Sequence, residues 1–292
     1  MAHACVETLV VAQIIERTNV QRRHCPIFSL VFDLAAESSK ENHMSKTVLI
    51  TGAGSGFGKG AAVALAARGH HVIATTETVE QAKELFSQHP ELRVEKIDIT
   101  NMADVQKIRD WPVDVLINNA GYGQTGPMSD VPLDRLRRVF EVNVFGTVAI
   151  TQATLPQMAA RGSGRVIIVS SIAGKFAAPG FGPYAMSKHA LEAMGKAMRP
   201  ELAPQGIDVC LLNPGPYNTG FNDRMADSMW EWFNDSSINA PAKEIHQAVG
   251  QMVTTNQMDP EEVVTRMVEL VEAESTTENN FVPEAIVAML NL

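Results

Sequence analysis

The sequence is poor in cysteine and has no long uncharged apolar run. Its 292 residues include three cysteines, Cys5, Cys25 and Cys210. Two of these lie within the first 43 residues, so the rest of the chain cannot form an internal disulfide. That fits a reducing compartment, and we expect the cytoplasm. No apolar stretch reaches the ~18–20 residues that a membrane-spanning helix needs. The sequence therefore excludes a disulfide-rich miniprotein, and we expect no membrane span.

An excess of basic residues is also missing. Lys and Arg number 24 against 33 Asp and Glu, which gives a formal net charge of −9. No long basic run offers a surface to nucleic-acid phosphates, so we expect no nucleic-acid partner. We also expect no metal site, because the adjacent His70 and His71 would point to opposite faces of a strand. With 45% hydrophobic and 20% charged residues, the chain is typical of globular proteins that bury a large core.

The first 43 residues differ from the rest of the chain. Two short apolar runs, 9–15 and 26–34, lie between charges, and Glu7 stands where the apolar core of a signal peptide would begin. We predict that residues 1–43 are a poorly ordered N-terminal extension and that Met44 is the natural start. A docking helix in this segment is the alternative.

From Met44 onward, short β-branched apolar runs alternate with longer helical patterns. Nearly continuous apolar strands are typical of a parallel sheet that is buried on both faces. The alternation predicts a single α/β domain over residues 44–292, with a doubly wound parallel sheet of Rossmann type flanked by helices. The expected strands are 47–51, 71–76, 92–96, 113–118, 165–170, 207–213 and a short one near 281–282. The expected helices are 58–68, 79–88, 102–109, 133–160, 184–203 and 260–274.

Residues 215–257 do not follow this alternation. Met225, Met229, Trp230 and Phe233 lie close together there among polar residues. A long insertion late in an α/β domain is often a lid over the site, and we predict a substrate lid. A helical pair packed on the core is the alternative. Pro200 is expected to kink the helix 184–203 or to end it early.

A glycine-rich turn follows the first expected strand and opens the first helix. It reads Thr51-Gly52-Ala53-Gly54-Ser55-Gly56-Phe57-Gly58. Glycines let the backbone turn sharply and approach a pyrophosphate, whose charge is met by amide groups at the helix N-terminus. Similar turns also occur for structural reasons, but the strand–turn–helix context favours nucleotide binding.

Tyr184 and Lys188 are spaced so that both side chains project from one face of a helix. An ammonium group close to a phenol stabilises the phenolate and lowers its pKa, which makes it an acid or base usable nearer neutral pH. Alone, such a pair usually lies on a solvated helix face. Here Asn143 and Ser171 accompany it in the sequence, as does an Asn-Asn-Ala-Gly segment at 118–121.

Taken together and in this order, the motifs resemble the short-chain dehydrogenase/reductase family in its compact single-domain branch. The resemblance covers essentially all of residues 45–292 and includes the Pro-Gly-x-x-x-Thr segment from Pro214 to Thr219. It implies hydride transfer between a nicotinamide cofactor and a carbonyl or alcohol. The stretches 118–123, 140–146 and 180–184 look like the 17β-hydroxysteroid and retinol dehydrogenase group. That group implies a small apolar ketone, aldehyde or secondary alcohol as substrate.

The resemblance also implies a role for each catalytic residue. Tyr184 would exchange the proton of the substrate oxygen, and Ser171 would hydrogen-bond the same oxygen. Lys188 would hold the nicotinamide ribose and depress the pKa of Tyr184, while Asn143 would anchor a water in a proton relay. The cofactor contacts implied are Gly52, Ser55, Gly56, Phe57, Gly58, Thr76, Glu77, Asp98, Ile99, Asn119, Ala120, Gly121, Tyr184, Lys188, Pro214, Gly215 and Thr219. Asp98 would contact the adenine, with a helix cap as the alternative.

The choice between NAD(H) and NADP(H) depends on the end of the second strand. Thr76 occupies the position that is usually acidic in NAD-dependent members, and Glu77 follows it. Neither 54–56 nor 75–79 contains an Arg or Lys to meet a 2′-phosphate. A carboxylate at Glu77 would repel that phosphate, so NAD(H) is favoured over NADP(H).

One residue departs from the pattern of the group. Asn213 stands where many members have Glu, which puts one substrate contact in doubt. A homodimer or homotetramer is expected through the helices 133–160 and 184–203. A cofactor-binding sensor without turnover is the rival to an enzyme, although such proteins typically lack a catalytic residue and here all four are present.

Overall fold

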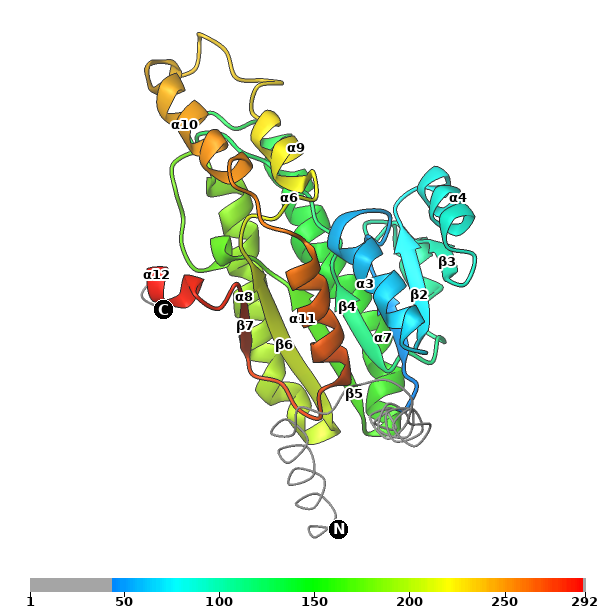
Figure 1. The fold of residues 1–292 in the computed structure, drawn as a ribbon. Helices are drawn as coiled ribbons and strands as arrows, with labels where there is room; N and C mark the ends of the chain where they lie inside the picture. Colours follow the sequence, from blue (N-terminus) through cyan, green and yellow to red (C-terminus); the bar gives the residue numbers. More distant parts are fainter. Residues whose placement is uncertain (1–43, 291–292) are drawn as a thin grey trace, which may run out of the picture. The chain divides into compact units, whose positions relative to one another are not determined.

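The strands of the chain form one parallel sheet, in the computed structural model that describes residues 44–290 (Figure 1). Its order is β3-β2-β1-β4-β5-β6-β7, and every neighbouring pair is parallel. The chain therefore winds outward in both directions from β1 and β4, which confirms the predicted doubly wound sheet. The strands are β1 (Thr47–Ile50), β2 (His71–Thr76), β3 (Arg93–Lys96), β4 (Val115–Asn118), β5 (Gly164–Val169), β6 (Ile207–Pro214) and β7 (Asn279–Val282).

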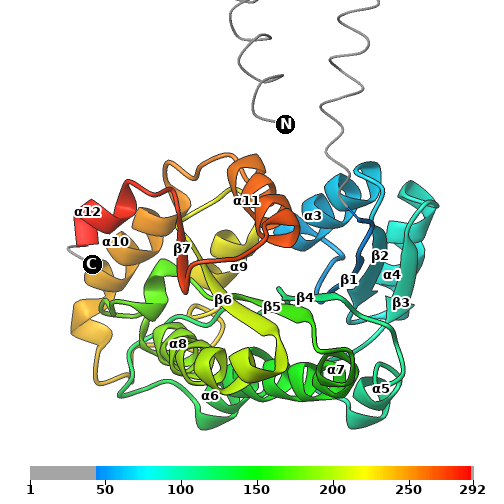
Figure 2. The same cartoon turned by 90° about the horizontal axis from the view of Figure 1, so that it is seen from below.

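Helices cover both faces of the sheet (Figure 2). One apolar core joins strand residues to α3 (Gly56–Ala67), α4 (Val79–Gln88) and α11 (Glu261–Glu272). A second core on the other face joins them to α5 (Met102–Gln106), α7 (Thr147–Arg161) and α8 (Gly182–Leu202). Because apolar layers lie on both sides, the strands are apolar along their whole length rather than alternating. The remaining helices are α6 (Leu133–Phe140), α9 (Phe221–Asp227), α10 (Lys243–Thr254) and α12 (Ile286–Leu290).

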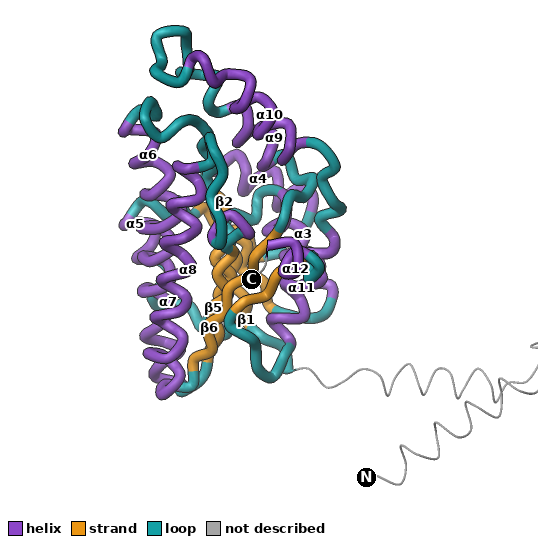
Figure 3. Tube along the Cα trace, turned by 90° about the vertical axis from the view of Figure 1, so that its left-hand side faces the viewer, coloured by secondary structure: helices purple, strands orange, loops and turns teal. Residues whose placement is uncertain are grey.

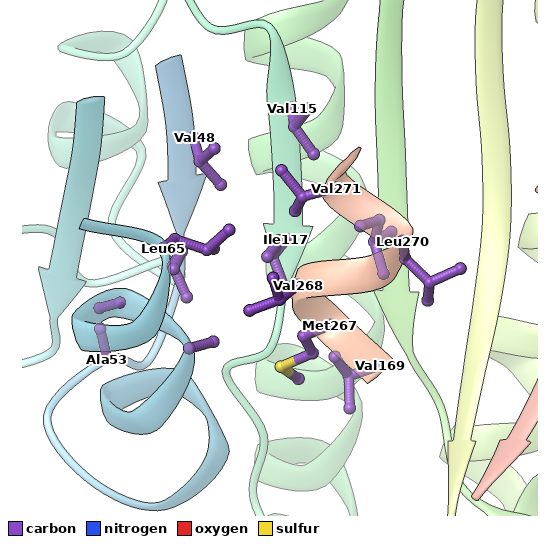
Figure 4. Packing of buried hydrophobic residues seen from close by; sticks show 14 of the residues in the cluster. Val48, Ala53, Leu65, Val115, Ile117, Val169, Met267, Val268, Leu270 and Val271 are labelled. Carbon is purple, nitrogen blue, oxygen red and sulfur yellow. The ribbon is translucent and has the colours of Figure 1, made fainter. Parts of the chain in front are cut away.

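Helices α3 and α11 pack closely although about 200 residues separate them. A Cβ added at Gly60 would lie 2.7 Å from a methyl group of Val264. Figure 4 shows α11 lying across the middle strands, with Val268 next to Ile117. The small residues of α3 therefore let the first helix lie directly against the last long one.

The long helix expected over 133–160 is not one regular helix. It consists of α6, a π-helical turn over Glu141–Gly146, and α7. A π-helical turn holds an extra residue, and such turns are frequent at functional sites. Asn143 lies in this turn. Helix α8 continues two residues beyond Pro200 and is followed by a 3-10 turn, Ala203–Gln205.

Residues 215–257 form α9, a 3-10 turn at Ala240–Ala242, and α10. Figures 1 and 3 show α9 and α10 side by side beyond the carboxyl ends of the strands. They contribute to a third, smaller apolar cluster that also includes Phe181 and Tyr184. This is the position that a lid would occupy. The predicted extension, residues 1–43, lies outside the described residues. Within 44–290, no helix is long and apolar enough to cross a membrane.

Candidate active site

A cavity of about 840 Å³ lies at the carboxyl ends of the strands. Its lining comes from the turn after β1, from the ends of β2, β4, β5 and β6, and from helices α8, α9 and α10. In doubly wound sheets, ligands bind at the carboxyl ends of the strands, next to the point where the strand order reverses. Most of the residues expected at the site line this cavity.

The glycine turn has the geometry that a closely approaching ligand needs. Gly52 and Gly56 have φ values of +66° and +54°, which side chains with a Cβ rarely adopt. A Cβ at Gly52 would lie 2.8 Å from the Cα of Ala120. A Cβ at Gly58 would lie 2.5 Å from the side-chain amide nitrogen (Nδ2) of Asn119. The turn is therefore pressed against the segment after β4, and only glycine fits there.

The start of α3 offers amide donors to the cavity. Ser55 is the N-cap residue, and its side chain makes no capping hydrogen bond. The N–H groups of the first helical turn have no partner within the helix, so they are available to an anion. Gly54, Ser55, Gly56 and Phe57 line the cavity beside them. This donor set fits the pyrophosphate of a dinucleotide.

Ser171, Tyr184 and Lys188 meet on the cavity wall. Ser171 follows β5, where its hydroxyl accepts a hydrogen bond from the Ala173 amide at 3.1 Å. Tyr184 and Lys188 lie one turn apart on α8, and both are buried. The Lys188 ammonium lies 5.5 Å from the centre of the Tyr184 ring and donates to the Val169 carbonyl at 2.9 Å. The structure therefore brings together three of the four residues expected to be catalytic.

The pKa values of this group differ from the sequence-based expectation. Burial raises the pKa of Tyr184, and a hydrogen bond with Ser171 opposes that shift. The resemblance implies that Lys188 lowers this pKa; in the structure the Lys188 ammonium donates to the Val169 carbonyl. Burial lowers the pKa of Lys188 to about 8, against the opposing charge of Glu192. Lys188 thus titrates close to neutral pH, and Tyr184 stays protonated there.

Asn143 lies behind the wall rather than on it. It is fully buried, and its amide oxygen accepts from the Tyr122 amide at 2.7 Å. Its amide nitrogen donates to the Tyr122 carbonyl and to the Ser187 hydroxyl, each at 2.9 Å. Ser187 in turn donates to the Tyr184 carbonyl at 2.7 Å. Asn143 therefore joins the π-helical turn to the first turns of α8, next to the tyrosine.

At the end of β2 the two expected residues face different surroundings. Thr76 is buried outside the cavity, and its hydroxyl donates to the Thr78 carbonyl at 3.0 Å. Glu77 lines the cavity and forms an ion pair with Arg138 of α6, with 2.9 Å between oxygen and nitrogen. Sequence reasoning missed Arg138 because it searched only the glycine turn and the residues around Glu77. No pattern along the sequence pointed to it, because Arg138 meets Glu77 across 61 residues.

The other cofactor contacts implied by the resemblance lie on the cavity wall. Asn119 holds the glycine turn by donating to the carbonyls of Thr51 and Gly52 at 2.9 and 3.1 Å. The carboxylate of Asp98 accepts from the Thr100 amide at 2.9 Å. The start of α5 is capped instead by Asn101. The predicted residues that line the wall here are Asp98, Ile99, Asn119, Ala120, Gly121, Pro214, Gly215 and Thr219. Gly58 supports the turn without lining the cavity.

The far end of the cavity is mostly apolar, although Asn222 and Arg224 of α9 also line the cavity, and the sequence analysis named only Met225 of its apolar residues. Its side chains come from the loop before α8, from α9 and α10, and from α12. They are Phe176, Ala178, Phe181, Phe221, Met225, Met252, Val253 and Ile286. Asn213 does not reach this surface, because it is buried and donates to a Glu192 oxygen at 2.6 Å.

Comparison with known proteins identifies this arrangement. A family model described as short chain dehydrogenase matches residues 46–230. The chain belongs to the short-chain dehydrogenase/reductase family and is an oxidoreductase. It is 37% identical over 233 residues to an uncharacterized oxidoreductase, YusZ, of Bacillus subtilis (strain 168), covering 74% of this chain and 79% of that one. It is 31% identical over 273 residues to human 17-beta-hydroxysteroid dehydrogenase type 1, covering 85% and 81%.

Solved structures agree with this placement. A short-chain dehydrogenase from Streptomyces avermitilis has a TM-score of 0.73 at 30% identity, covering 85% of this chain and 92% of that one. Two others show the same fold at lower identity. One, from Burkholderia phymatum, is in complex with NAD, with a TM-score of 0.72, 24% identity, and 86% and 93% covered. The other, a serine dehydrogenase, is complexed with NADP+, with a TM-score of 0.69, 23% identity, and 80% and 93% covered.

Proposed function

We propose that the protein transfers hydride between a nicotinamide dinucleotide and an apolar ketone, aldehyde or secondary alcohol, with Tyr184 as the acid and base. The observation that carries the proposal is the meeting of Ser171, Tyr184 and Lys188 between the glycine turn and an apolar end of one cavity. A bound nicotinamide supplies or accepts the hydride. The protein residues bind, orient and move the proton.

Tyr184 provides the proton in carbonyl reduction. Burial keeps its phenol protonated at neutral pH, so it can donate to the oxygen on which negative charge develops. The Ser171 hydroxyl hydrogen-bonds the same oxygen and stabilises that charge. Lys188, buried beside the ring, holds the cofactor ribose. Asn143 orients the start of α8 through Ser187.

The apolar end of the cavity supports an apolar substrate. Its wall includes Phe181, Phe221, Met225 and Val253, which belong to one apolar cluster. Burying an apolar substrate there is favourable at roughly 25 cal/mol for each Å² removed from water. The name of the human relative, a 17-beta-hydroxysteroid dehydrogenase, agrees with a substrate of this class. Helices α9 and α10 serve as the lid over this end.

NAD(H) is the favoured cofactor in this proposal. Glu77 lines the cavity at the end of β2, where a carboxylate accepts a hydrogen bond from a free ribose hydroxyl. It also repels a 2′-phosphate. Arg138, its ion-pair partner, reduces that repulsion, so the preference is moderate.

The experiment is turnover of NADH and NADPH by the full chain over a series of apolar ketones and aldehydes, beside Tyr184→Phe. We expect NADH oxidation with at least one member, and a ~10²–10⁴-fold lower kcat in Tyr184→Phe with NADH affinity unchanged. Tight NADH binding without turnover of any member would favour the cofactor-binding sensor instead. Unchanged turnover in Tyr184→Phe would refute the assignment of the acid.

We also propose a cytoplasmic homodimer or homotetramer that uses the face of α7 and α8. Phe145, beside α7, and Met186, on α8, are 58% and 44% exposed. Large apolar side chains left exposed on long helices are consistent with a contact between copies. Light scattering on the purified chain tests this, and a monomer at micromolar concentration would refute it.

A further inference from the structure

An ion pair forms part of the cavity wall beside the end of β2. Glu77 and Arg138 both line the cavity, and 2.9 Å separates the carboxylate oxygen from the guanidinium nitrogen. Their side chains are 56% and 42% exposed. An ion pair this exposed adds little to folding stability. Its position on the cavity wall therefore points to a role in binding.

Arg138 is the cation placed to meet a ligand at this end. Among residues 44–290, the cations that line the cavity are Arg138, Lys188 and Arg224. Lys188 is buried beside Tyr184, and Arg224 belongs to α9. Of these three cations, Arg138 is the one that forms an ion pair with Glu77. The nearby Lys96 is occupied by Asp104, with 2.5 Å between nitrogen and oxygen.

The glutamate of the pair marks where the adenosine ribose would lie. In doubly wound folds an acidic residue at the end of the second strand accepts a hydrogen bond from the ribose 2′-hydroxyl. Glu77 follows β2 directly and is fixed there because its own amide donates to the Gln81 side chain at 3.1 Å. Any phosphate on that hydroxyl would be brought to the Glu77–Arg138 pair.

We propose that Arg138 binds the 2′-phosphate of NADP(H), and that its ion pair with Glu77 opens so that the enzyme accepts both dinucleotides. The proposal rests on the dinucleotide binding proposed above. A phosphate monoester carries about two negative charges at neutral pH, so it attracts a guanidinium more strongly than one carboxylate does. Arginine also meets phosphate oxygens in a two-bond geometry.

The two cofactors then use the pair differently. With NAD(H) the ion pair stays closed, and the Glu77 oxygen that is not bonded to Arg138 is left to accept from the ribose hydroxyl. With NADP(H) the Arg138 side chain turns to the phosphate, and Glu77, being more than half exposed, moves into solvent. The cation comes from α6, outside the glycine turn and the residues next to β2. The enzyme therefore accommodates NADP(H) because Arg138 exchanges the Glu77 carboxylate for the 2′-phosphate, and no basic residue next to β2 is needed.

The test is direct binding of NADH and NADPH to the full chain, followed by nicotinamide fluorescence, which does not depend on turnover. We compare wild type with Arg138→Ala, Arg138→Lys, Glu77→Gln and Arg137→Ala. Arg137 is the matched control, because it is the neighbouring arginine on α6, is exposed, and does not line the cavity. Thermal unfolding of each variant confirms that it is folded.

We expect wild type to bind both cofactors. Arg138→Ala should weaken NADPH binding ~10- to 100-fold, as the loss of charged hydrogen bonds does, and NADH binding by less than about threefold. Arg138→Lys should recover part of the NADPH affinity. Glu77→Gln should strengthen NADPH and weaken NADH, while Arg137→Ala should change neither.

Three outcomes would overturn the proposal. The first is an equal loss of NADPH affinity in Arg138→Ala and Arg137→Ala, which would mean that only the overall charge matters. The second is an Arg138→Ala variant with unchanged NADPH affinity. The third is a wild type that binds NADH and not NADPH. A wild type that binds neither dinucleotide would overturn the proposed function as well.

Discussion

The two ends of the cavity are built in different ways. At the cofactor end the wall is mostly backbone and small residues, held where the strands stop, such as Gly52, Gly56 and Ala120. At the substrate end the wall is made of large apolar side chains from a loop and from three helices that are distant in sequence, such as Phe176, Met225 and Met252. At Gly52 on the first surface, an added Cβ would lie 2.8 Å from the Cα of Ala120. The second depends on size and shape.

The two ends therefore leave different traces in the sequence: cofactor binding and catalysis leave residues at fixed spacing, whereas an apolar substrate pocket does not. A turn that must approach a pyrophosphate leaves glycines at fixed spacing, and an acid–base pair leaves Tyr184 and Lys188 one turn apart. An apolar pocket can be filled by many combinations of side chains, so it leaves no such pattern. Substitutions at the two ends should therefore act on different measured quantities.

The largest effect is expected from Gly52→Ala. Its φ of +66° is strained for alanine, and the added Cβ would lie 2.8 Å from the Cα of Ala120. We expect the free energy of unfolding to fall by about 2–4 kcal/mol and NADH binding to be lost. Chemical denaturation and NADH fluorescence measure the two quantities.

Gly69→Ala is the matched control for this change. Gly69 also has a positive φ, +88°, but a Cβ there meets nothing within 4 Å. It should lose only the strain of the backbone, about 1–2 kcal/mol, with NADH affinity intact. Equal losses in both variants would show that the close approach to Ala120 is unimportant.

A smaller effect is expected where the two ends meet, from Glu192→Gln. Glu192 raises the pKa of Lys188 against the lowering by burial, which leaves it at about 8. If carbonyl reduction needs the charged Lys188, its rate is highest below this pKa and falls as the pH rises through it. Without the Glu192 charge the pKa falls further, so the rate should decline at a lower pH than in wild type. The pH profile of kcat/KM for reduction measures this.

Glu201→Gln is the control for Glu192→Gln, because Glu201 lies on the same helix and is exposed. Its profile should match the wild-type profile. A Glu192→Gln profile that stays in place or moves to higher pH would show that Glu192 does not support the lysine charge.

The smallest effect is expected at the substrate end, from Met252→Ala. Met252 lines the cavity but is 58% exposed, so only part of its apolar area can meet a substrate. We expect KM for a long apolar ketone to rise ~3- to 10-fold, with KM for NADH unchanged. Ile245 on the same helix is 55% exposed and does not line the cavity, so Ile245→Ala should leave both constants unchanged. A change in KM for NADH in Met252→Ala would show that the substrate end and the cofactor end do not act independently.

Much of the fold was predictable because buried parallel strands have a simple pattern. Each of the seven expected strands is present within a few residues, and the helix expected over 79–88 has those bounds. The exception is the region 133–160. The π-helical turn over Glu141–Gly146 contains Asn143, whose side chain bonds the Tyr122 backbone, a tertiary contact that periodicity along the chain cannot show.

The site was predictable where its residues act through spacing along one element. Tyr184, Lys188 and the glycine turn are of this kind, and they line the cavity as expected. Arg138 was missed because it meets Glu77 across 61 residues. The direction of the Tyr184 pKa shift was not predictable, since the sequence shows the spacing to Lys188 and cannot show that burial raises this pKa.

The packing of α3 against α11 bears on how the protein is made. The helix that follows the glycine turn packs against one that begins at Glu261, and a Cβ at Gly60 would lie 2.7 Å from a methyl group of Val264. A ribosome that has released only the first half of the chain has made α3 without the helix that covers it. Contacts between such distant segments form late and slowly. We therefore expect the glycine turn to become functional only after α11 has been translated.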